Sequence, residues 1–217
     1  MPFLVKHLGL ADYASTYEAM RTFTKERDAN TPDEIWVLQH PPVFTLGLAG
    51  DANNLHSPSL DIPLVQVDRG GEITYHGPGQ IVVYLLLDLK RLGIFVKELV
   101  SRIEQAVIDT LADYGLQAQR LKGAPGIYIA IQAGVLEEWY GAKVAALGLK
   151  VSKSCSYHGL ALNVSTDLEA FSRIHPCGYE GLRTVDMQTL GIKDNIDTIS
   201  QKLLAHLQKQ LMSHEHK

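Results

Sequence analysis

Hydrophobic residues recur along the chain in two patterns, one typical of helices and the other of strands. Apolar side chains three or four residues apart predict helices over 12–27, 98–114 and 196–211. Shorter apolar or alternating runs predict strands over 3–8, 34–39, 64–67, 81–87, 127–131, 143–151 and 158–164. Since helices and strands follow one another without regular βαβ spacing, the pattern predicts an α+β fold with a mixed or antiparallel central sheet flanked by helices, rather than a doubly wound fold.

One segment interrupts this pattern. Residues 43–63 are rich in Gly, Pro, Asn and Ser and predict a long surface loop around one short strand. The chain has no internal repeat and no linker of biased composition. Its 217 residues therefore favour a single domain over 1–217, with a polar tail near 213–217.

Charge and hydropathy narrow the classes of function. The 20 Lys and Arg residues against 24 Asp and Glu leave a net charge of -4, which argues against a dedicated nucleic-acid binder. The longest unbroken apolar run, over 81–87, is far shorter than the ~20 residues of a membrane-spanning helix, so no membrane partner is expected. The first residues lack the pattern of a secretory signal, and we expect a cytoplasmic protein.

Neither a metal site nor a disulfide framework is expected. The two cysteines, Cys155 and Cys177, are far apart and form no Cys-x-x-Cys pair. The histidines are scattered without the spacing of metal ligands.

The segment over 69–80, Arg-Gly-Gly-Glu-Ile-Thr-Tyr-His-Gly-Pro-Gly-Gln, is the first candidate for chemistry. Four of its ten residues over 70–79 are glycine, which lets a backbone approach a ligand closely. Arg69, Thr74 and His76 offer hydrogen bonds beside these glycines. The spacing matches neither common phosphate-binding loop, and contact with a ligand is favoured over a convoluted turn between strands.

Four further residues have competing interpretations. Cys177 stands in a Pro-Cys-Gly bend that would present a thiol, although a buried, inert thiol is favoured on composition alone. Lys143 begins an apolar strand, where it is either a desolvated proton carrier or, by preference, a solvated strand end. Cys155, between serines, is assigned to packing, and His158 to a structural or substrate-lining role.

Taken together, four motifs resemble the LipB octanoyltransferase family, within the biotin/lipoate protein ligase-like superfamily. They are the segment over 69–80, Lys-Val-Ala-Ala-Leu-Gly over 143–148, His-Gly-Leu-Ala-Leu-Asn over 158–163 and Pro-Cys-Gly over 176–178, in the order of the family. The resemblance covers nearly the whole chain. It implies the α+β fold of that superfamily and a ping-pong transfer of an octanoyl group, through a cysteine thioester, to lysine amines of lipoyl domains.

The resemblance also implies roles for individual residues. Cys177 would be the acyl-thioester nucleophile and Lys143 the residue that lowers the pKa of its thiol, which overturns the preferences stated above for both. Substrate contacts would fall on the following residues: Arg69, Gly70, Gly71, Glu72, Ile73, Thr74, Tyr75, His76, Ala146, Leu147, Gly148, Gly159, Leu160 and Ala161. No cofactor is implied, because the acyl group arrives on the phosphopantetheine arm of acyl carrier protein.

The implied partners are acyl carrier protein as donor, and lipoyl domains of 2-oxoacid dehydrogenase E2 subunits and the glycine cleavage H protein as acceptors. Because acyl carrier proteins are acidic, we hypothesise that some of Arg120, Lys122, Lys150 and Lys153 form a docking strip. The connection over 131–142 is longer than in many relatives, and we expect a surface hairpin there, rather than a lid or an oligomer contact. Two alternatives stay open: an ATP-dependent lipoate or biotin ligase, and a non-catalytic carrier-binding module.

Overall fold

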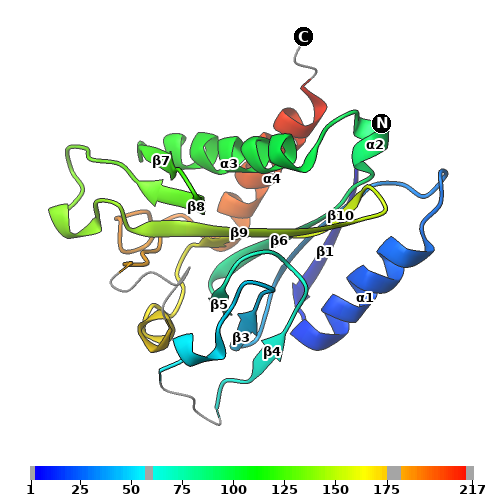
Figure 1. Cartoon of the computed structure of the whole chain (residues 1–217). Helices are drawn as coiled ribbons and strands as arrows, with labels where there is room; N and C mark the ends of the chain where they lie inside the picture. The colour runs from blue at the N-terminus through cyan, green and yellow to red at the C-terminus, as the bar shows by residue number, and fades with distance from the viewer. Residues whose placement is uncertain (1–2, 57–60, 175–181, 214–217) are drawn as a thin grey trace.

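A seven-stranded sheet runs through the molecule (Figure 1). The computed structural model describes residues 3–56, 61–174 and 182–213. β1 and β2 are parallel, and every other pair of neighbours in this sheet is antiparallel, which confirms the predicted α+β fold with a mixed sheet. In spatial order the strands are β1 (Leu4–Leu10), β2 (Glu34–Gln39), β6 (Gln80–Leu86), β10 (Cys155–Asn163), β9 (Lys143–Ser152), β8 (Ala124–Ile129) and β7 (Ala118–Leu121).

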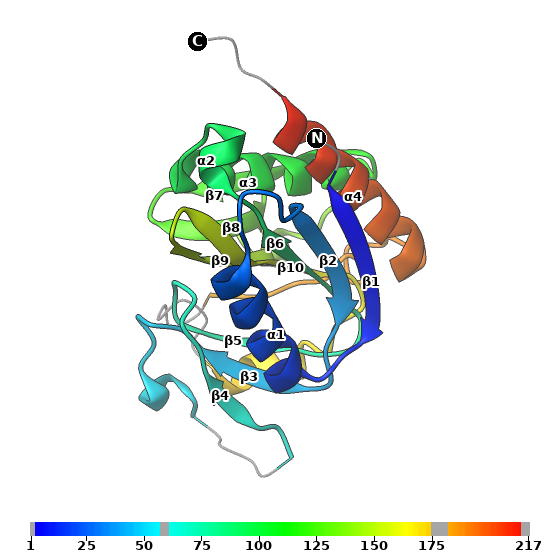
Figure 2. The same ribbon diagram turned by 90° about the vertical axis from the view of Figure 1, so that its right-hand side faces the viewer.

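Helices cover both faces of this sheet (Figures 1 and 2). Side chains of β6 alternate, so that Val83 and Leu85 pack in the core with α3 and α4, whereas Val82 and Tyr84 pack in a cluster with α1. Because both faces are covered, β6 is apolar throughout, which explains the unbroken run over 81–87. The helices of the two layers are α1 (Tyr13–Glu26), α3 (Val96–Ala112) and α4 (Ile196–Met212).

A smaller sheet of three strands lies beside the large one (Figure 1). Phe44 and Tyr75 of this sheet pack with Phe171, which belongs to a 3₁₀ turn over Glu169–Arg173. In spatial order its strands are β4 (Leu64–Gln66), β3 (Val43–Leu46) and β5 (Ile73–His76). The remaining elements are α2 (Leu89–Leu92) and 3₁₀ turns over Ala52–Asn54 and Glu137–Trp139.

The predicted helices and strands are all present, with ends displaced by a few residues. The long loop over 43–63 contains one short strand, β3, as expected. Two strands, one short α-helix and the 3₁₀ turns were not predicted: the strands are β5 inside the glycine-rich segment and the short polar edge strand β7, and the helix is α2. None of the helices in the described residues is long and apolar enough to cross a membrane.

A tight turn joins β9 to β10, and β10 begins at Cys155, earlier than predicted. The two residues of this turn, Lys153 and Ser154, both have positive φ, 50° and 62°. A two-residue hairpin turn of this kind normally carries Asn or Gly, which adopt left-handed backbone conformations at low cost. The Lys-Ser pair gives no such signal, so the start of the strand was missed.

The connection over 131–142 is a surface segment with one 3₁₀ turn, not a hairpin of its own. Trp139 packs against the main core, and the Tyr140 hydroxyl donates to the carbonyls of Gln132 and Val135 at 3.1 and 3.3 Å. These contacts fold the segment onto itself at the β8–β9 end of the sheet. No residue of it lines the cavity described below.

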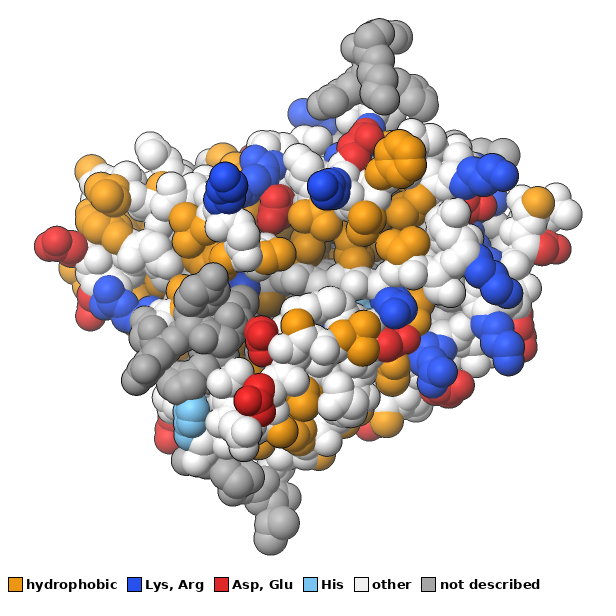
Figure 3. Space-filling model, viewed as in Figure 1, with side chains coloured by type: hydrophobic (Ala, Val, Ile, Leu, Met, Phe, Trp, Pro, Cys, Tyr) orange, Lys and Arg blue, Asp and Glu red, His pale blue; other side chains and the backbone are white. Residues whose placement is uncertain are grey.

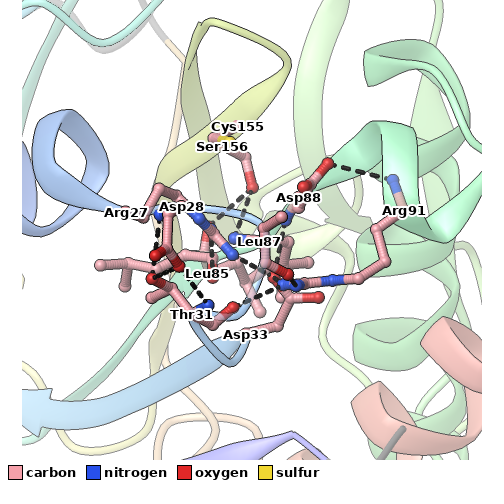
Figure 4. A network of polar contacts seen from close by, with 12 residues as sticks. Arg27, Asp28, Thr31, Asp33, Leu85, Leu87, Asp88, Arg91, Cys155 and Ser156 are labelled. Atoms are coloured by element: carbon pink, nitrogen blue, oxygen red, sulfur yellow. Dashed lines mark hydrogen bonds and ion pairs between the residues drawn. The ribbon is translucent and has the colours of Figure 1, made fainter.

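A buried cluster of ion pairs joins α1, α2 and the start of β2 (Figure 4). One Asp33 oxygen lies 2.6 Å from the guanidinium groups of both Arg27 and Arg91 and accepts the backbone N–H of Asp88 at 2.7 Å. The Asp33 side chain is 9% exposed and that of Arg27 is 3% exposed. Since water reaches them poorly, each charge depends on the others for compensation.

Replacing Asp33 tests this dependence. Asp33→Asn should lower the free energy of unfolding by about 3 kcal/mol, because two guanidinium groups would keep their positions without a counter-charge. Urea denaturation at neutral pH measures the loss. Asp61→Asn is the control, because the Asp61 carboxylate is 64% exposed and lies 3.5 Å from Arg173, and it should cost no more than about 0.5 kcal/mol. Equal small losses in both variants would show that the cluster is not needed.

Candidate active site

A cavity of about 410 Å³ is lined by segments that lie far apart in the sequence. The glycine-rich segment forms one wall, β9 and β10 form a second, and the start of α3 with the β7–β8 turn forms a third. Three of the four motifs therefore meet at one place. The predicted site residues in the lining are Lys143, Arg69, Gly70, Gly71, Glu72, Ile73, Thr74, His76, Ala146, Leu147, Gly148, Gly159, Leu160 and Ala161.

Tyr75 is the predicted substrate-binding residue that does not line the cavity. Side chains alternate along β5, so Thr74 and His76 face the cavity, while Tyr75 points into the core of the smaller sheet. Its ring lies 5.7 Å from that of Phe44 and 5.5 Å from that of Phe171. The Tyr75 side chain thus packs in the smaller sheet, and its predicted contact with substrate stays a prediction.

The glycine-rich segment lies directly against β9. The backbone N–H of Gly70 donates to the Leu149 carbonyl at 3.0 Å. A Cβ atom on Gly148 would lie 2.9 Å from the Gly70 carbonyl oxygen, closer than real contacts allow. Glycine is thus required at 148 by the approach of two backbones.

Arg69 is buried and holds this wall to the smaller sheet. Its guanidinium donates to the Thr45 carbonyl at 2.9 Å, to the Thr45 hydroxyl at 2.8 Å and to the Gly70 carbonyl at 3.0 Å. The side chain that was predicted to contact substrate therefore also fixes the shape of the cavity wall.

Lys143 begins β9 and is 6% exposed. Its ammonium donates to the Pro125 carbonyl at 3.0 Å and lies 5.5 Å from the centre of the Tyr128 ring. Gly126 makes room for this side chain, because a Cβ atom there would lie 2.5 Å from Lys143 Cε and 3.1 Å from Nζ. The ammonium thus projects into the cavity from a fixed position.

The structure describes one of the two cysteines, Cys155. Cys177, the predicted nucleophile, lies outside the described residues. Cys155 is 7% exposed at the start of β10, outside the cavity lining, and its thiol lies 3.5 Å from the Lys153 carbonyl. Burial raises the pKa of the Cys155 thiol, which keeps it protonated and unreactive, in keeping with the predicted packing role.

A chain of hydrogen bonds through buried side-chain amides runs along the cavity wall and was not predicted. His76 Nδ1 donates to Gln80 Oε1 at 2.7 Å, and Gln80 Nε2 donates to Asn163 Oδ1 at 2.9 Å. Asn163 Nδ2 donates in turn to the Val185 carbonyl, whose own N–H donates to the Lys143 carbonyl at 3.0 Å. Burial lowers the pKa of His76 to about 3, so this ring is a neutral hydrogen-bonding group.

Aromatic residues line another part of the cavity. Tyr13 and Tyr84 are buried there, and burial raises the pKa of Tyr13 to about 12. His40, behind them, donates from Nδ1 to the Ala11 carbonyl at 2.6 Å, so its Nε2 accepts the Tyr84 hydroxyl at 2.7 Å. Burial lowers the pKa of His40 and keeps this ring neutral.

Asp68 anchors the base of the glycine-rich segment to β10. It accepts the Tyr157 hydroxyl at 2.5 Å and lies 3.1 Å from His158 Nε2. Burial alone would raise the pKa of Asp68, but hydrogen bonds from His158, Tyr157 and Tyr17 outweigh it and hold that pKa well below its usual range. His158 has a left-handed backbone conformation, with a φ of 59°, and its side chain lines the cavity. The bond to Asp68 and this position together agree with the structural or lining role expected for it.

Among residues 3–56, 61–174 and 182–213, no group of three or more His, Cys, Asp or Glu side chains is placed to hold a metal ion.

Comparison with protein families matches residues 12–208 to the lipoyl protein ligase A/B catalytic domain. A relative named octanoyltransferase from Polynucleobacter asymbioticus is 84% identical over 212 residues, which cover 98% of this chain and 99% of the relative. Another of the same name from Paraburkholderia phymatum is 57% identical and covers 95% of this chain and 81% of its own length.

Solved structures show the same fold at low identity. A bi-partite lipoate protein ligase from Thermoplasma acidophilum superposes with a TM-score of 0.70 at 16% identity, covering 97% of this chain and 84% of its own. A lipoate-protein ligase A bound with ATP gives 0.72 at 16% identity, with coverage of 97% and 86%. These likenesses confirm the predicted superfamily fold and the central sheet with its two helical layers.

The low pKa of Asp68 generates a testable dependence of stability on pH. In the unfolded chain an aspartate titrates near pH 3.9, so the stabilisation by Asp68 should be complete above about pH 4 and decline as pH falls toward its folded pKa. Asp68→Asn should lower the free energy of unfolding by about 1 kcal/mol at pH 7 and by progressively less below pH 4. Denaturation of both proteins across this range measures the difference. A difference that is constant with pH would contradict the assignment.

Proposed function

The chain belongs to the lipoyl protein ligase A/B catalytic family, and from this we propose that it transfers an octanoyl group to a lysine of lipoyl domains through a thioester on Cys177. The observation that carries the proposal is the high identity, over almost the whole chain, to relatives named octanoyltransferase. The chain is thus an acyltransferase. Acyl carrier protein as donor and the lipoyl domains of 2-oxoacid dehydrogenases and the glycine cleavage H protein as acceptors, in the cytoplasm, complete the proposal.

The reaction proceeds in two acyl transfers. The Cys177 thiolate attacks the donor thioester carbonyl, forms the enzyme thioester and expels the carrier thiolate, which takes a proton from the Lys143 ammonium. The acceptor lysine amine then attacks the enzyme thioester, forms the amide and releases the Cys177 thiolate. Lys143, now a neutral amine, takes up the proton that the acceptor nitrogen loses. Atoms and protons balance, and neither ATP nor a cofactor is consumed.

The described residues supply the rest of the site. Pro125 and Tyr128 hold the Lys143 ammonium in place, and its charge favours the thiolate form of a neighbouring cysteine. Apolar side chains such as Val82, Leu147 and Leu160 offer a slot for the alkyl chain. Each buried methylene contributes about 0.8 kcal/mol, so the six methylenes of octanoyl contribute at most ~5 kcal/mol.

The covalent step can be tested by intact mass. Incubation with octanoylated acyl carrier protein and no ATP should add one octanoyl group to the protein, and Cys177→Ser should remove this adduct. Cys155→Ser is the matched control and should keep the adduct, because the Cys155 thiol lies outside the cavity lining. Strict dependence on ATP would favour the ligase alternative instead. Carrier binding without any acyl transfer would favour a non-catalytic module.

The position of Lys143 can be tested through Gly126. Gly126→Ala should lower kcat by about tenfold or more, because the new Cβ atom would lie 2.5 Å from Lys143 Cε and 2.6 Å from the Ala145 carbonyl oxygen, so both the Lys143 ammonium and the β8–β9 backbone would have to shift. Gly134→Ala is the control, because Gly134 also has positive φ, 84°, yet a Cβ atom there meets nothing within 4 Å. Steady-state transfer to a lipoyl domain measures both. Equal effects on the two variants would assign the loss to backbone strain.

A further inference from the structure

The rim of the cavity beside α3 exposes apolar side chains. Phe95 is 80% exposed, Val96 42% and Leu121 41%. Val96 also lines the cavity, and so does Gly123, in the turn that follows Leu121 at the end of β7. The apolar surface therefore continues from the rim into the cavity. Figure 3 shows hydrophobic side chains gathered along this face, with Lys and Arg side chains among them.

The helix itself gives no reason for an exposed aromatic side chain at Phe95. It occupies the N-cap position of α3 and makes no capping hydrogen bond, although this position favours Ser, Thr, Asp or Asn. An aromatic side chain left in water beside other apolar residues is typical of an interaction surface.

The charge of this rim is positive. Both acidic residues of the adjoining part of α3 are already paired with arginines: Glu98 with Arg102 at 2.6 Å, and Glu104 with Arg120 at 3.0 Å. Lys97 and Lys122 are exposed, and no described acidic side chain forms an ion pair with either. The rim therefore carries uncompensated positive charge on a chain with a net charge of -4.

Each of the two lysines is next in sequence to a residue that lines the cavity: Lys97 follows Val96 and Lys122 precedes Gly123. Arg120 bonds to the Ser101 carbonyl and to Gln105, which fixes β7 beside α3. Lys97 precedes Ser101 by one helical turn, about 6 Å along the axis. The wall formed by the glycine-rich segment carries one cation, Arg69, and one acid, Glu72, so its charges balance.

We propose that the residues Phe95, Val96, Lys97, Leu121 and Lys122, here called the α3 rim, form the docking surface for the acidic carrier protein that presents the octanoyl thioester. The proposal rests on the proposed function. The folded body of the carrier must stay outside the cavity while its phosphopantetheine arm reaches Lys143. The α3 rim borders the cavity opening, and its positive charge complements the carboxylates of an acidic carrier. The apolar side chains would be covered by the carrier, as at other interfaces with a hydrophobic centre and a polar edge.

This surface refines the docking strip expected from the sequence. Lys122 stays in it, whereas Arg120 is engaged with Glu104. Lys150 lies on β9 four residues beyond Ala146, where β8 pairs, which is roughly 13 Å at the usual rise per strand residue, and Lys153 lies further on, in the turn after β9. They are therefore left out of the α3 rim.

The test compares a protein donor with a small one. In the double variant Lys97→Glu/Lys122→Glu, kcat/KM for octanoyl acyl carrier protein should fall about tenfold at low salt, and less at high salt. With octanoyl pantetheine, which has no carrier surface, kcat/KM should stay unchanged. Phe95→Ala should also weaken use of the carrier donor alone, with little dependence on salt.

Lys25→Glu/Lys209→Glu is the matched control, because these exposed lysines lie on α1 and α4, and it should leave both donors unaffected. Equal effects on both donors, no effect on either, or a raised KM for the lipoyl domain instead of the carrier would overturn the α3 rim as the carrier surface. Failure of the parent protein to transfer octanoyl from either donor would instead refute the proposed function.

Discussion

The site depends on the contact between two backbones that leaves no room for side chains. Gly70 donates its N–H to the Leu149 carbonyl at 3.0 Å, and Gly148 passes so near the Gly70 carbonyl that a Cβ atom is excluded. This contact closes the cavity wall between the glycine-rich segment and β9. Beside this contact, Arg69 bonds to the smaller sheet and Asp68 bonds to β10 of the large sheet. The glycine-rich wall is therefore attached to both sheets. A wall preorganised in this way would bind a ligand without the entropic cost of ordering a loop.

The buried histidines in and around the site are neutral. His40, His76 and His158 are buried, and burial lowers the pKa of each. Their hydrogen bonds to carbonyl, amide and carboxylate groups fix ring orientation without adding positive charge. His76 and His158 line the same cavity as Lys143, so neither ring adds a second positive charge there.

Much of the fold was predictable, because most strands carry apolar runs bounded by glycine or proline. Lys143 and the lining residues of β9 and β10 lie on predicted strands for this reason. The roles of Lys143 and Cys177 came from the family resemblance, since their residue types alone favoured ordinary packing or exposure. Cys177 lies outside the described residues, and its role stays a prediction.

The remaining features depend on pairings that no local pattern encodes. Gln80 and Asn163 meet through the alignment of β6 with β10, although both stood in motifs that were already recognised. The contact of Gly126 with Lys143 requires the shifted register between β8 and β9. The Lys153–Ser154 turn adopts left-handed backbone conformations without a residue that favours them, so tertiary pairing overrides local preference there.

The two edges of the large sheet share an irregularity. In β1 the register with β2 shifts between His7 and Gly9, and in β7 the register with β8 shifts between Gln119 and Leu121. A regular, flat edge would offer a row of unpaired backbone groups to any extended chain that met it, and irregular edges pair poorly. These irregularities disfavour growth of the sheet by strand addition at either end, where edge strands β1 and β7 carry exposed apolar side chains.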